Sequence, residues 1–240
     1  LLNNSQITNI LNSTTNWSTS SGGSSGASFP VAGDIVIFDS HSGNMTVNVN
    51  SACLTIDFTG GGSSNYSGLW TITNGITLTV SGNITNSPTM TWATTTGTLL
   101  CNATATLTSN GKAINSLFQF GGTSQTFTLA GGNNWIFGNN LSTFGTSSTV
   151  NTTTTEQIEC RANMTNNANG VIGTAVILLS GTGLHTSAGT LGLNIVVNTS
   201  GTATFGNFKW SGSSFTTTAG TCTQQSGTTF SLTSNTATFN

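Results

Sequence analysis

Charged side chains are almost missing from this chain. Its 240 residues contain three Lys or Arg and five Asp or Glu, 3% of the sequence, whereas an ordinary soluble domain is about 25% charged. Threonine, serine, asparagine and glycine are abundant instead. Like charges directly opposite one another destabilise a sheet, so this composition favours a fold that stacks similar neutral side chains in columns. The charged residues are Asp34, Asp39, Asp57, Lys112, Glu156, Glu159, Arg161 and Lys209.

Apolar and polar residues alternate over short segments that are separated by turn signals. The stretch 69–85 contains three such segments, divided by the pairs Asn74-Gly75 and Ser81-Gly82. A two-residue period is typical of strands, and these dipeptides are typical of turns. No segment shows a sustained apolar period of 3.6 residues, so we expect an all-β protein with minimal helix.

The spacing of apolar residues along the chain distinguishes between the possible all-β folds. Apolar centres recur every 18 to 24 residues, at Leu54, Leu78, Leu99, Phe118 and Ile136. A solenoid repeats a coil of about 20 residues, whereas a sandwich has even strands with turns every 8–12 residues. We therefore expect an elongated β-solenoid, similar to a parallel β-helix, with short Thr-rich strands. A jelly roll or β-sandwich is the alternative.

The first thirty residues differ from the remainder. Residues 20–26 are Ser and Gly only, a composition typical of flexible linkers. We expect an N-terminal arm and linker over 1–30 and a β-solenoid domain over 31–240. The chain starts without Met and stops in the middle of a strand pattern, so we expect a fragment or processed part of a longer protein.

Composition argues against several partners. The net charge is −2 and the only basic residues are Lys112, Arg161 and Lys209, which cannot form the basic stripe that neutralises nucleic-acid phosphates. No run approaches the ~20 consecutive apolar residues that span a membrane. We expect no nucleic acid, no membrane insertion and no cofactor.

The four cysteines are widely separated, at Cys53, Cys101, Cys160 and Cys222. No Cys-x-x-Cys pair is present, although zinc sites usually need close ligand spacing. We interpret these residues as small buried hydrophobic side chains. Disulfides are the alternative if the protein is secreted.

Glu156, Glu159 and Arg161, beside Cys160, are the nearest approach to a reactive cluster. Two carboxylates can cleave glycosidic bonds, but an ion pair is the simpler interpretation. In a strand, Glu159 and Arg161 would share one face, and Glu156 would lie on the other.

Other polar residues offer weaker candidates. Asp34, Asp39 and Asp57 could ligate calcium, but no EF-hand loop is present, and Asp34 after a glycine suits a turn. We expect His41 and His185 to be ordinary surface or corner residues without acidic or cysteine partners. We assign no catalytic, cofactor-binding or metal-binding residue.

Thr-x-Thr triplets recur along the chain. Stacked on one face they would resemble an ice-binding surface, but their starting positions advance irregularly, so we attribute them to the strand propensity of threonine. They lie at 71–73, 77–79, 89–91, 104–108 and 126–128.

Two stretches resemble a known group of proteins. The first stretch consists of Asn16-Trp17-Ser18, a Gly/Ser loop and the segment Phe29–Asp39. The second consists of short Thr-rich units such as Ile76–Ile84. This pattern resembles β-solenoid repeat segments of bacteriophage tail-fibre and appendage proteins and of large secreted bacterial surface proteins. The resemblance covers residues 16–110. Its motifs are structural, and it implies no catalytic residue.

The resemblance implies an elongated component of a virion or of a bacterial surface. Charge normally limits unwanted assembly, and its near absence leads us to expect a non-enzymatic structural component of a bacteriophage virion: a fibre, an appendage or a capsid decoration. Such a protein would associate with itself or other virion proteins, attach to host-surface glycans, and be found in the virion or outside the cell. The first alternative is a secreted bacterial adhesin or extracellular filament subunit, and the second is a β-helix polysaccharide lyase or hydrolase using Glu156 or Glu159. An adhesin could stack exposed aromatic rings on sugars, with Trp17, Tyr66, Trp70, Trp92, Trp135 and Trp210 as candidates.

Overall fold

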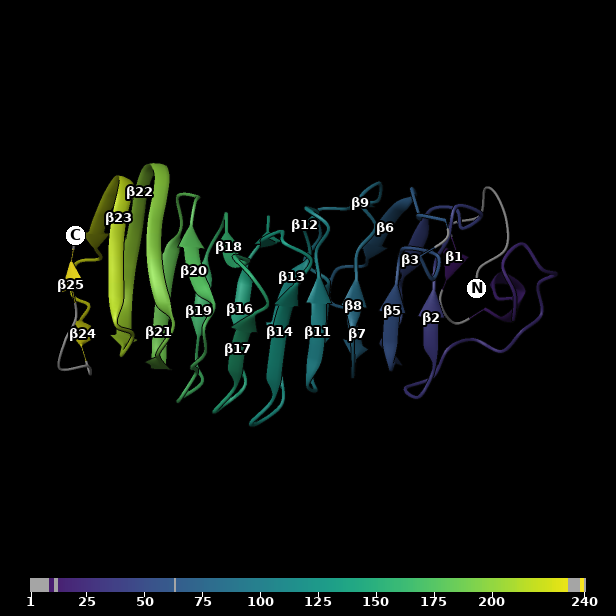
Figure 1. Cartoon of the computed structure of the whole chain (residues 1–240), viewed down its shortest axis with the longest axis horizontal. Coiled ribbons are helices and arrows are strands. Elements are labelled where there is room, and N and C mark those ends of the chain that lie inside the picture. The colour runs from purple at the N-terminus through teal and green to yellow at the C-terminus, as the bar shows by residue number, and fades with distance from the viewer. Residues whose placement is uncertain (1–8, 11–12, 63, 233–237, 240) are drawn as a thin grey trace.

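The computed structural model describes residues 9–10, 13–62, 64–232 and 238–239. It is a rod-shaped parallel β-solenoid of about 9 turns (Figure 1). Every pairing between named strands is parallel, which excludes the antiparallel jelly roll or sandwich. The expected β-solenoid is confirmed, and the described helix is limited to one 3-10 turn, η1 (Thr14–Asn16).

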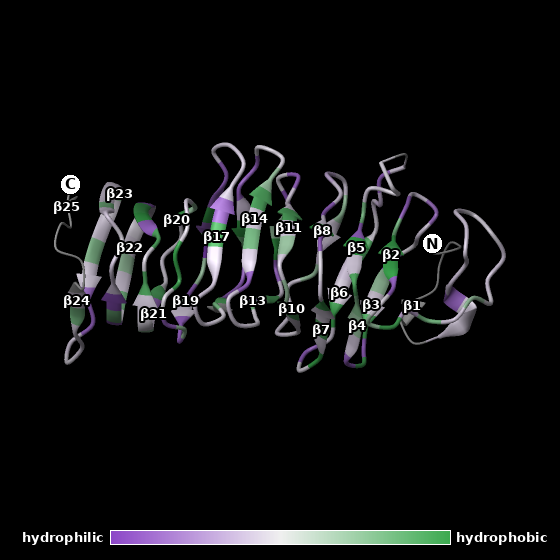
Figure 2. Ribbon diagram, turned by 60° about the horizontal axis from the view of Figure 1, so that its bottom comes forward, coloured by the Kyte–Doolittle hydropathy of each residue, from purple (hydrophilic) through white to green (hydrophobic). Residues whose placement is uncertain are grey.

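Three sheets run along the rod. The shortest sheet contains β1 (Asn9–Ile10), β3 (Met45–Val47), β6 (Leu69–Ile72) and β9 (Thr91–Trp92). The six-stranded sheet contains β2 (Ile35–Ile37), β5 (Thr55–Asp57), β8 (Ile84–Thr85), β11 (Ala105–Thr108), β14 (Thr126–Ala130) and β17 (Thr149–Thr152). Figure 2 shows these six strands side by side in one row.

The remaining strands form one 15-stranded sheet with two branches. Its first branch contains β12 (Ala113–Ile114), β15 (Trp135–Phe137), β18 (Gln157–Cys160) and β20 (Val176–Leu179). Its second branch contains β4 (Ser51–Cys53), β7 (Thr77–Val80), β10 (Thr98–Cys101), β13 (Leu117–Phe120), β16 (Leu141–Thr143), β19 (Met164–Asn166) and β21 (Leu184–Leu191).

The long strand β22 (Asn194–Trp210) joins the two branches of this sheet. It pairs with β20 through Asn194–Val197 and with β21 from Thr204 onward. It is followed by β23 (Ser214–Gln224), β24 (Phe230–Leu232) and β25 (Thr238–Phe239), which pair with β22 or with β23. These strands form the C-terminal end of the described rod.

Alternate side chains point into a thin apolar core. In β10, for example, Leu99 and Cys101 are buried and their neighbours in the strand are half-buried. Aromatic rings from successive turns stack in this core: Phe38 and Phe58 lie 5.1 Å apart at an interplanar angle of 16°. The fold therefore buries apolar surface layer by layer, each buried side chain contributing about 1.5–3 kcal/mol.

The apolar period found in the sequence is only partly correct. Leu78, Leu99 and Phe118 are buried and directly paired in neighbouring turns. Leu54, however, is 39% exposed, and Ile136 lies in β15, on the other branch of the sheet. Corners contain different numbers of residues in different turns, so a single interval cannot follow one face.

Asparagine side chains link successive turns at the corners. Several lie immediately before a strand, and their Oδ1 atoms accept a hydrogen bond from a backbone N–H between 19 and 27 residues later. They satisfy donors at corners, as N-cap residues do for helices. The asparagines with this bond are Asn44, Asn50, Asn74, Asn83, Asn134, Asn140, Asn151, Asn163, Asn169, Asn194 and Asn207.

The described residues of the expected arm and linker pack against the first turn. Trp17 is 3% exposed, and its ring lies 5.9 Å from that of Phe38. The backbone N–H groups of Gly26 and Ala27 both donate to the Trp17 carbonyl. This segment thus covers part of the N-terminal end of the core. Residues 1–8 and 11–12 of the expected arm lie outside the described residues.

Among the described residues, no helix has the length and the apolar character needed to span a membrane.

Candidate functional site

The carboxylate of Glu159 forms an ion pair on the outer side of β18. Arg161 Nε donates to Glu159 Oε1 at 2.6 Å, and Ser180 Oγ donates to the same oxygen at 3.0 Å. These bonds outweigh the effect of burial and lower the pKa of Glu159 below its ordinary value. The prediction that Glu159 and Arg161 share one face is confirmed.

Glu156 lies in the corner before β18 and is buried. Gly132 N donates to Oε1 at 2.9 Å and Thr154 N to Oε2 at 2.8 Å, and Thr153 Oγ1 donates to Oε1 at 2.8 Å. Burial alone would raise the pKa of Glu156, but these bonds lower it to about 2. A glycosidase acid needs a raised pKa, so this carboxylate is suited to holding a corner together and unsuited to donating a proton.

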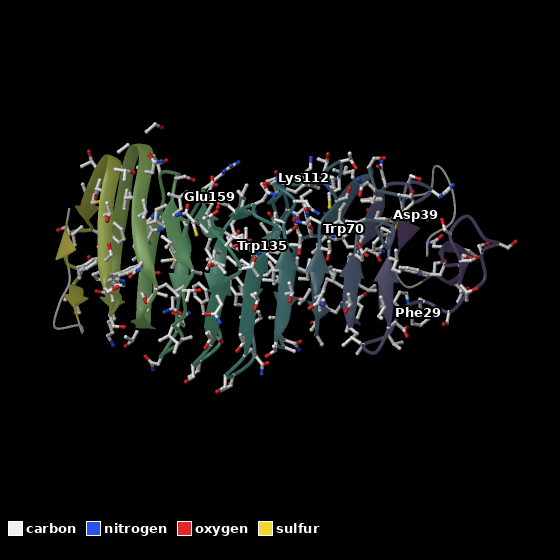
Figure 3. The ribbon with its side chains drawn as sticks, viewed as in Figure 1. Phe29, Asp39, Trp70, Lys112, Trp135 and Glu159 are labelled. Carbon is white, nitrogen blue, oxygen red and sulfur yellow. The ribbon has the colours of Figure 1, made fainter. Side chains whose placement is uncertain are left out.

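A second polar cluster lies at the N-terminal end, far from Glu159 (Figure 3). Asp39 is 1% exposed and accepts hydrogen bonds from Ser21 Oγ and from the His41 backbone N–H. His41 Nδ1 lies 3.6 Å from Asp39 Oδ2 and 3.4 Å from Ser21 Oγ. The expectation that His41 has no acidic partner is therefore wrong.

This cluster differs from a catalytic triad. In a triad the histidine contacts the serine through one ring nitrogen and the acid through the other, whereas here Nδ1 of His41 faces both groups. Burial would raise the pKa of Asp39, but the bonds from Ser21 and His41 keep it below its ordinary value. The arrangement ties the Gly/Ser loop to the first turn of the rod.

Each of the three aspartates considered as calcium ligands accepts hydrogen bonds from residues near it in the chain. Asp34 Oδ2 accepts from Val31 N at 2.9 Å, and Asp57 Oδ1 accepts from Thr59 N at 2.7 Å. Within the described residues, no group of three His, Cys, Asp or Glu side chains is placed to hold a metal ion. Asp34 acts in a turn, as expected.

His185 lies in the core, contrary to the expectation of a surface or corner residue. Its side chain is fully buried, and its ring lies 5.5 Å from that of Phe205. Neither ring nitrogen has a hydrogen-bond partner among the residues that the structure describes. Burial lowers the pKa of His185 to about 4, so the imidazole is neutral at pH 7. The alternating pattern of β21 directs this residue inward.

All six aromatic residues considered for sugar stacking are buried, with at most 3% of each exposed. Figure 3 shows Trp70 and Trp135 inside the rod. They are core residues because they occupy inward positions of strands and corners, so they cannot stack on a glycan.

The four cysteines are all free thiols. Cys53, Cys101 and Cys160 are buried, as expected, but Cys222 is exposed on β23. Burial raises the pKa of Cys53 and of Cys101 to about 12, which keeps these thiols protonated and unreactive.

The outer side of β8, β11, β14 and β17 in the six-stranded sheet carries threonines in neighbouring turns. In its ladder Thr85 pairs with Thr108, Thr106 with Thr128, and Thr126 with Thr149. These side chains are half-buried or exposed and alternate with buried residues. We define the threonine face by these outward residues: Thr85, Thr106, Thr108, Thr126, Thr128, Ala130, Thr149 and Asn151.

No family model, curated protein or solved structure matches this chain. The resemblance to bacteriophage and bacterial solenoid segments therefore remains an expectation from the sequence.

Proposed function

We propose that this chain is a non-enzymatic structural component of a bacteriophage virion, in a fibre, an appendage or a capsid decoration. It works by associating with copies of itself or with other virion proteins, and it contributes to attachment at the host surface. The observation that supports this proposal is a nearly uncharged rod whose sheets, among the described residues, have open edges at both ends.

The C-terminal edge is formed by β23. One side of this strand pairs with β22 along most of its length, while within the described residues the other side pairs with β25 only at Ser214 and Phe215. The stretch 216–224 contains no charged residue and no proline. Native proteins usually protect such edges with charges, prolines or bulges. The pairing of β23 with β22 shifts register around Ala219 but is continuous from Thr221 to Gln224, so this last part of the strand is suited to pairing with another chain.

The opposite end of the rod carries a second open edge. β2 is the last strand of its sheet among the described residues, and Ile35 in this strand is 64% exposed. Because all the sheets are parallel, the two ends are complementary and not identical. Head-to-tail contacts between copies would continue each sheet and generate a fibre.

Light scattering after size-exclusion chromatography tests this association. We expect the wild-type chain to form elongated oligomers whose mass rises with concentration. Thr221→Lys places a charge on the open edge of β23 and should shift the protein to the monomer. Thr79→Lys places the same charge on the outer side of β7, within the rod, and should leave the oligomers unchanged. A wild-type chain that stays monomeric at all concentrations contradicts the proposal.

The location is tested separately with antibodies against the chain. Gold labelling along a fibre or on the capsid of intact phage particles would support the virion assignment. Labelling confined to the bacterial surface would contradict it and favour the adhesin or filament alternative.

A further inference from the structure

We propose that the threonine face binds ice. This inference goes beyond the structural role above and rests on a different part of the molecule, the outer side of β8, β11, β14 and β17. The ligand is the ordered lattice of water molecules at an ice surface, and rows of threonine side chains on the protein bind it.

The backbone arranges these threonines in a two-dimensional array. Parallel strands lie about 4.8 Å apart, and residues i and i+2 of one strand lie about 7 Å apart on the same side. The ladder from β11 to β14 and from β14 to β17 continues without a register shift. Thr106 is therefore aligned with Thr128, and Thr126 with Thr149, so the hydroxyl groups repeat at two regular spacings, as the water oxygens of an ice surface do.

The chemistry of the array suits ordered water. Each threonine presents one hydroxyl, which both donates and accepts a hydrogen bond, and one methyl group that holds no water strongly. Its branched Cβ restricts χ1, so little side-chain freedom is lost on binding. None of the hydroxyls of Thr106, Thr108 or Thr128 bonds to another group within the described residues, so each remains available to water.

The face is also free of charge over these strands. Asp57, which pairs with Thr85 in the ladder, borders it at β8, and the remaining outward positions of β11, β14 and β17 are neutral. A charged side chain would hold its own hydration shell and disturb a regular water layer. The uncharged area thus extends over at least three adjacent turns.

The outward columns at the middle of the two branches of the long sheet are mixed. On the second branch of the long sheet, Thr79 pairs with Leu100, and Leu100 pairs with Gln119. On the first branch, Ile136 pairs with Glu159 and Glu159 with Leu178. Mixed apolar, amide and charged columns do not present a repeating hydroxyl lattice. Threonines also pair at Thr202–Thr221 and Thr204–Thr223, but these pairs join only β22 and β23, whereas the threonine face extends over β8, β11, β14 and β17.

The irregular spacing of Thr-x-Thr triplets in the sequence conceals this array. Triplets at 71–73 and 77–79 begin within β6 and β7, in other sheets, so the five triplets do not form one face, as expected. The triplets at 104–108 and 126–128 do stack, however, and Thr149 extends their array by a third turn.

A second copy of this chain fits the face less well than ice. Protein interfaces gain most of their energy from buried apolar surface, and Ala130 is the one apolar residue of the threonine face. A crystalline polysaccharide would be expected to stack on aromatic rings, and the face contains none.

Ice growth in solutions of the whole chain tests the proposal. We expect the wild-type protein to arrest ice growth below the melting point and to inhibit ice recrystallisation. Thr128→Tyr and Thr106→Tyr each place a bulky ring in the array and should abolish both effects. Thr79→Tyr is the matched control on β7 and should retain them. Circular dichroism and thermal melting establish that all three variants are folded.

Two results would overturn the proposal: a wild-type chain without effect on ice growth, or full activity in both threonine-face variants. A change in oligomeric mass on Thr128→Tyr, without any ice activity in the wild type, would assign the face to self-association. The Thr221→Lys edge variant keeps the threonine face intact, so failure of end-to-end association and failure of ice binding are distinguished.

Discussion

Asn163 Oδ1 accepts a hydrogen bond of 2.8 Å from the backbone N–H of Leu184, which lies 21 residues later in the chain. Asn163 precedes β19, and Leu184 begins β21, the next strand of the same branch. The backbone N–H of Asn163 in turn donates to Asn140 Oδ1 at 3.3 Å. A column of asparagines thus links three successive turns, and similar bonds recur at other corners.

Removing one such bond should destabilise the rod measurably. Asn163→Ala leaves the Leu184 N–H without its protein acceptor, which by analogy with N-cap residues costs about 1 kcal/mol. For a chain of this size we expect a melting temperature lower by about 2–4 °C. Asn167→Ala is the control, because Asn167 is exposed and its side chain makes no hydrogen bond in the described structure. Equal melting temperatures for the two variants would contradict the proposed role.

Glu156→Gln should reduce stability while Glu159→Gln has a smaller effect. The Glu156 carboxylate accepts bonds from several donors in a buried corner, and glutamine replaces one acceptor oxygen with an NH₂ group that faces donors. An unsatisfied buried donor costs about 1–3 kcal/mol. Chemical denaturation at pH 7 measures both losses. Because the pKa of Glu156 is lowered to about 2, the wild-type protein also loses this stabilisation as the pH falls from about 4.5 towards 2.

His185 should make the protein sensitive to mild acid. Its pKa in the folded protein is about 4, compared with 6.5 for the unperturbed side chain. Between these values the unfolded chain binds a proton and the folded chain does not, so the stability falls as the pH is lowered from about 6.5 to 4. The loss amounts to roughly 3 kcal/mol at the lower limit.

The variant His185→Met tests this assignment. Methionine fills a similar apolar site without titrating, so the unfolding free energy of the variant should vary less between pH 6.5 and 4 than that of the wild type. Parallel pH profiles of the two proteins would show that another group causes the acid sensitivity.

Thiol reactivity should separate Cys222 from the other cysteines. A small disulfide reagent such as dithionitrobenzoate should label Cys222 in the native protein and label Cys53, Cys101 and Cys160 only after unfolding, because these three are buried. Cys222→Ser should abolish the native-state reaction. Rapid labelling of a second thiol without denaturant would show that the core opens more readily than its packing implies.

Local sequence patterns predicted the fold class because strands and turns depend on near neighbours. Alternation in segments such as 77–80 and turn pairs such as Asn74-Gly75 gave short strands, and Leu78, Leu99 and Phe118 stack as their spacing suggested. The prediction failed for Leu54 and Ile136 because corners vary in length. The same asparagine bond connects residues 27 apart at Asn50 and 19 apart at Asn194.

The polar sites were harder to predict because their partners come from distant parts of the chain. Ser21 reaches Asp39 across a Gly/Ser loop that has no periodic signal. The lack of acidic or cysteine neighbours in the sequence predicts a surface or corner position for His185, but the alternation of β21 places it inside. For this residue the register of the strand is a better guide than its polarity.

The sequence by itself determined a nearly uncharged protein of short strands in repeated layers, since composition, alternation and turn residues act locally. Only the tertiary structure decided which threonines share a face and which strand edges lie at the ends of the rod. Both features depend on how many residues each intervening strand and corner contains. Because side chains alternate between the two sides of a strand, adding or removing one residue would move a side chain from the surface to the core.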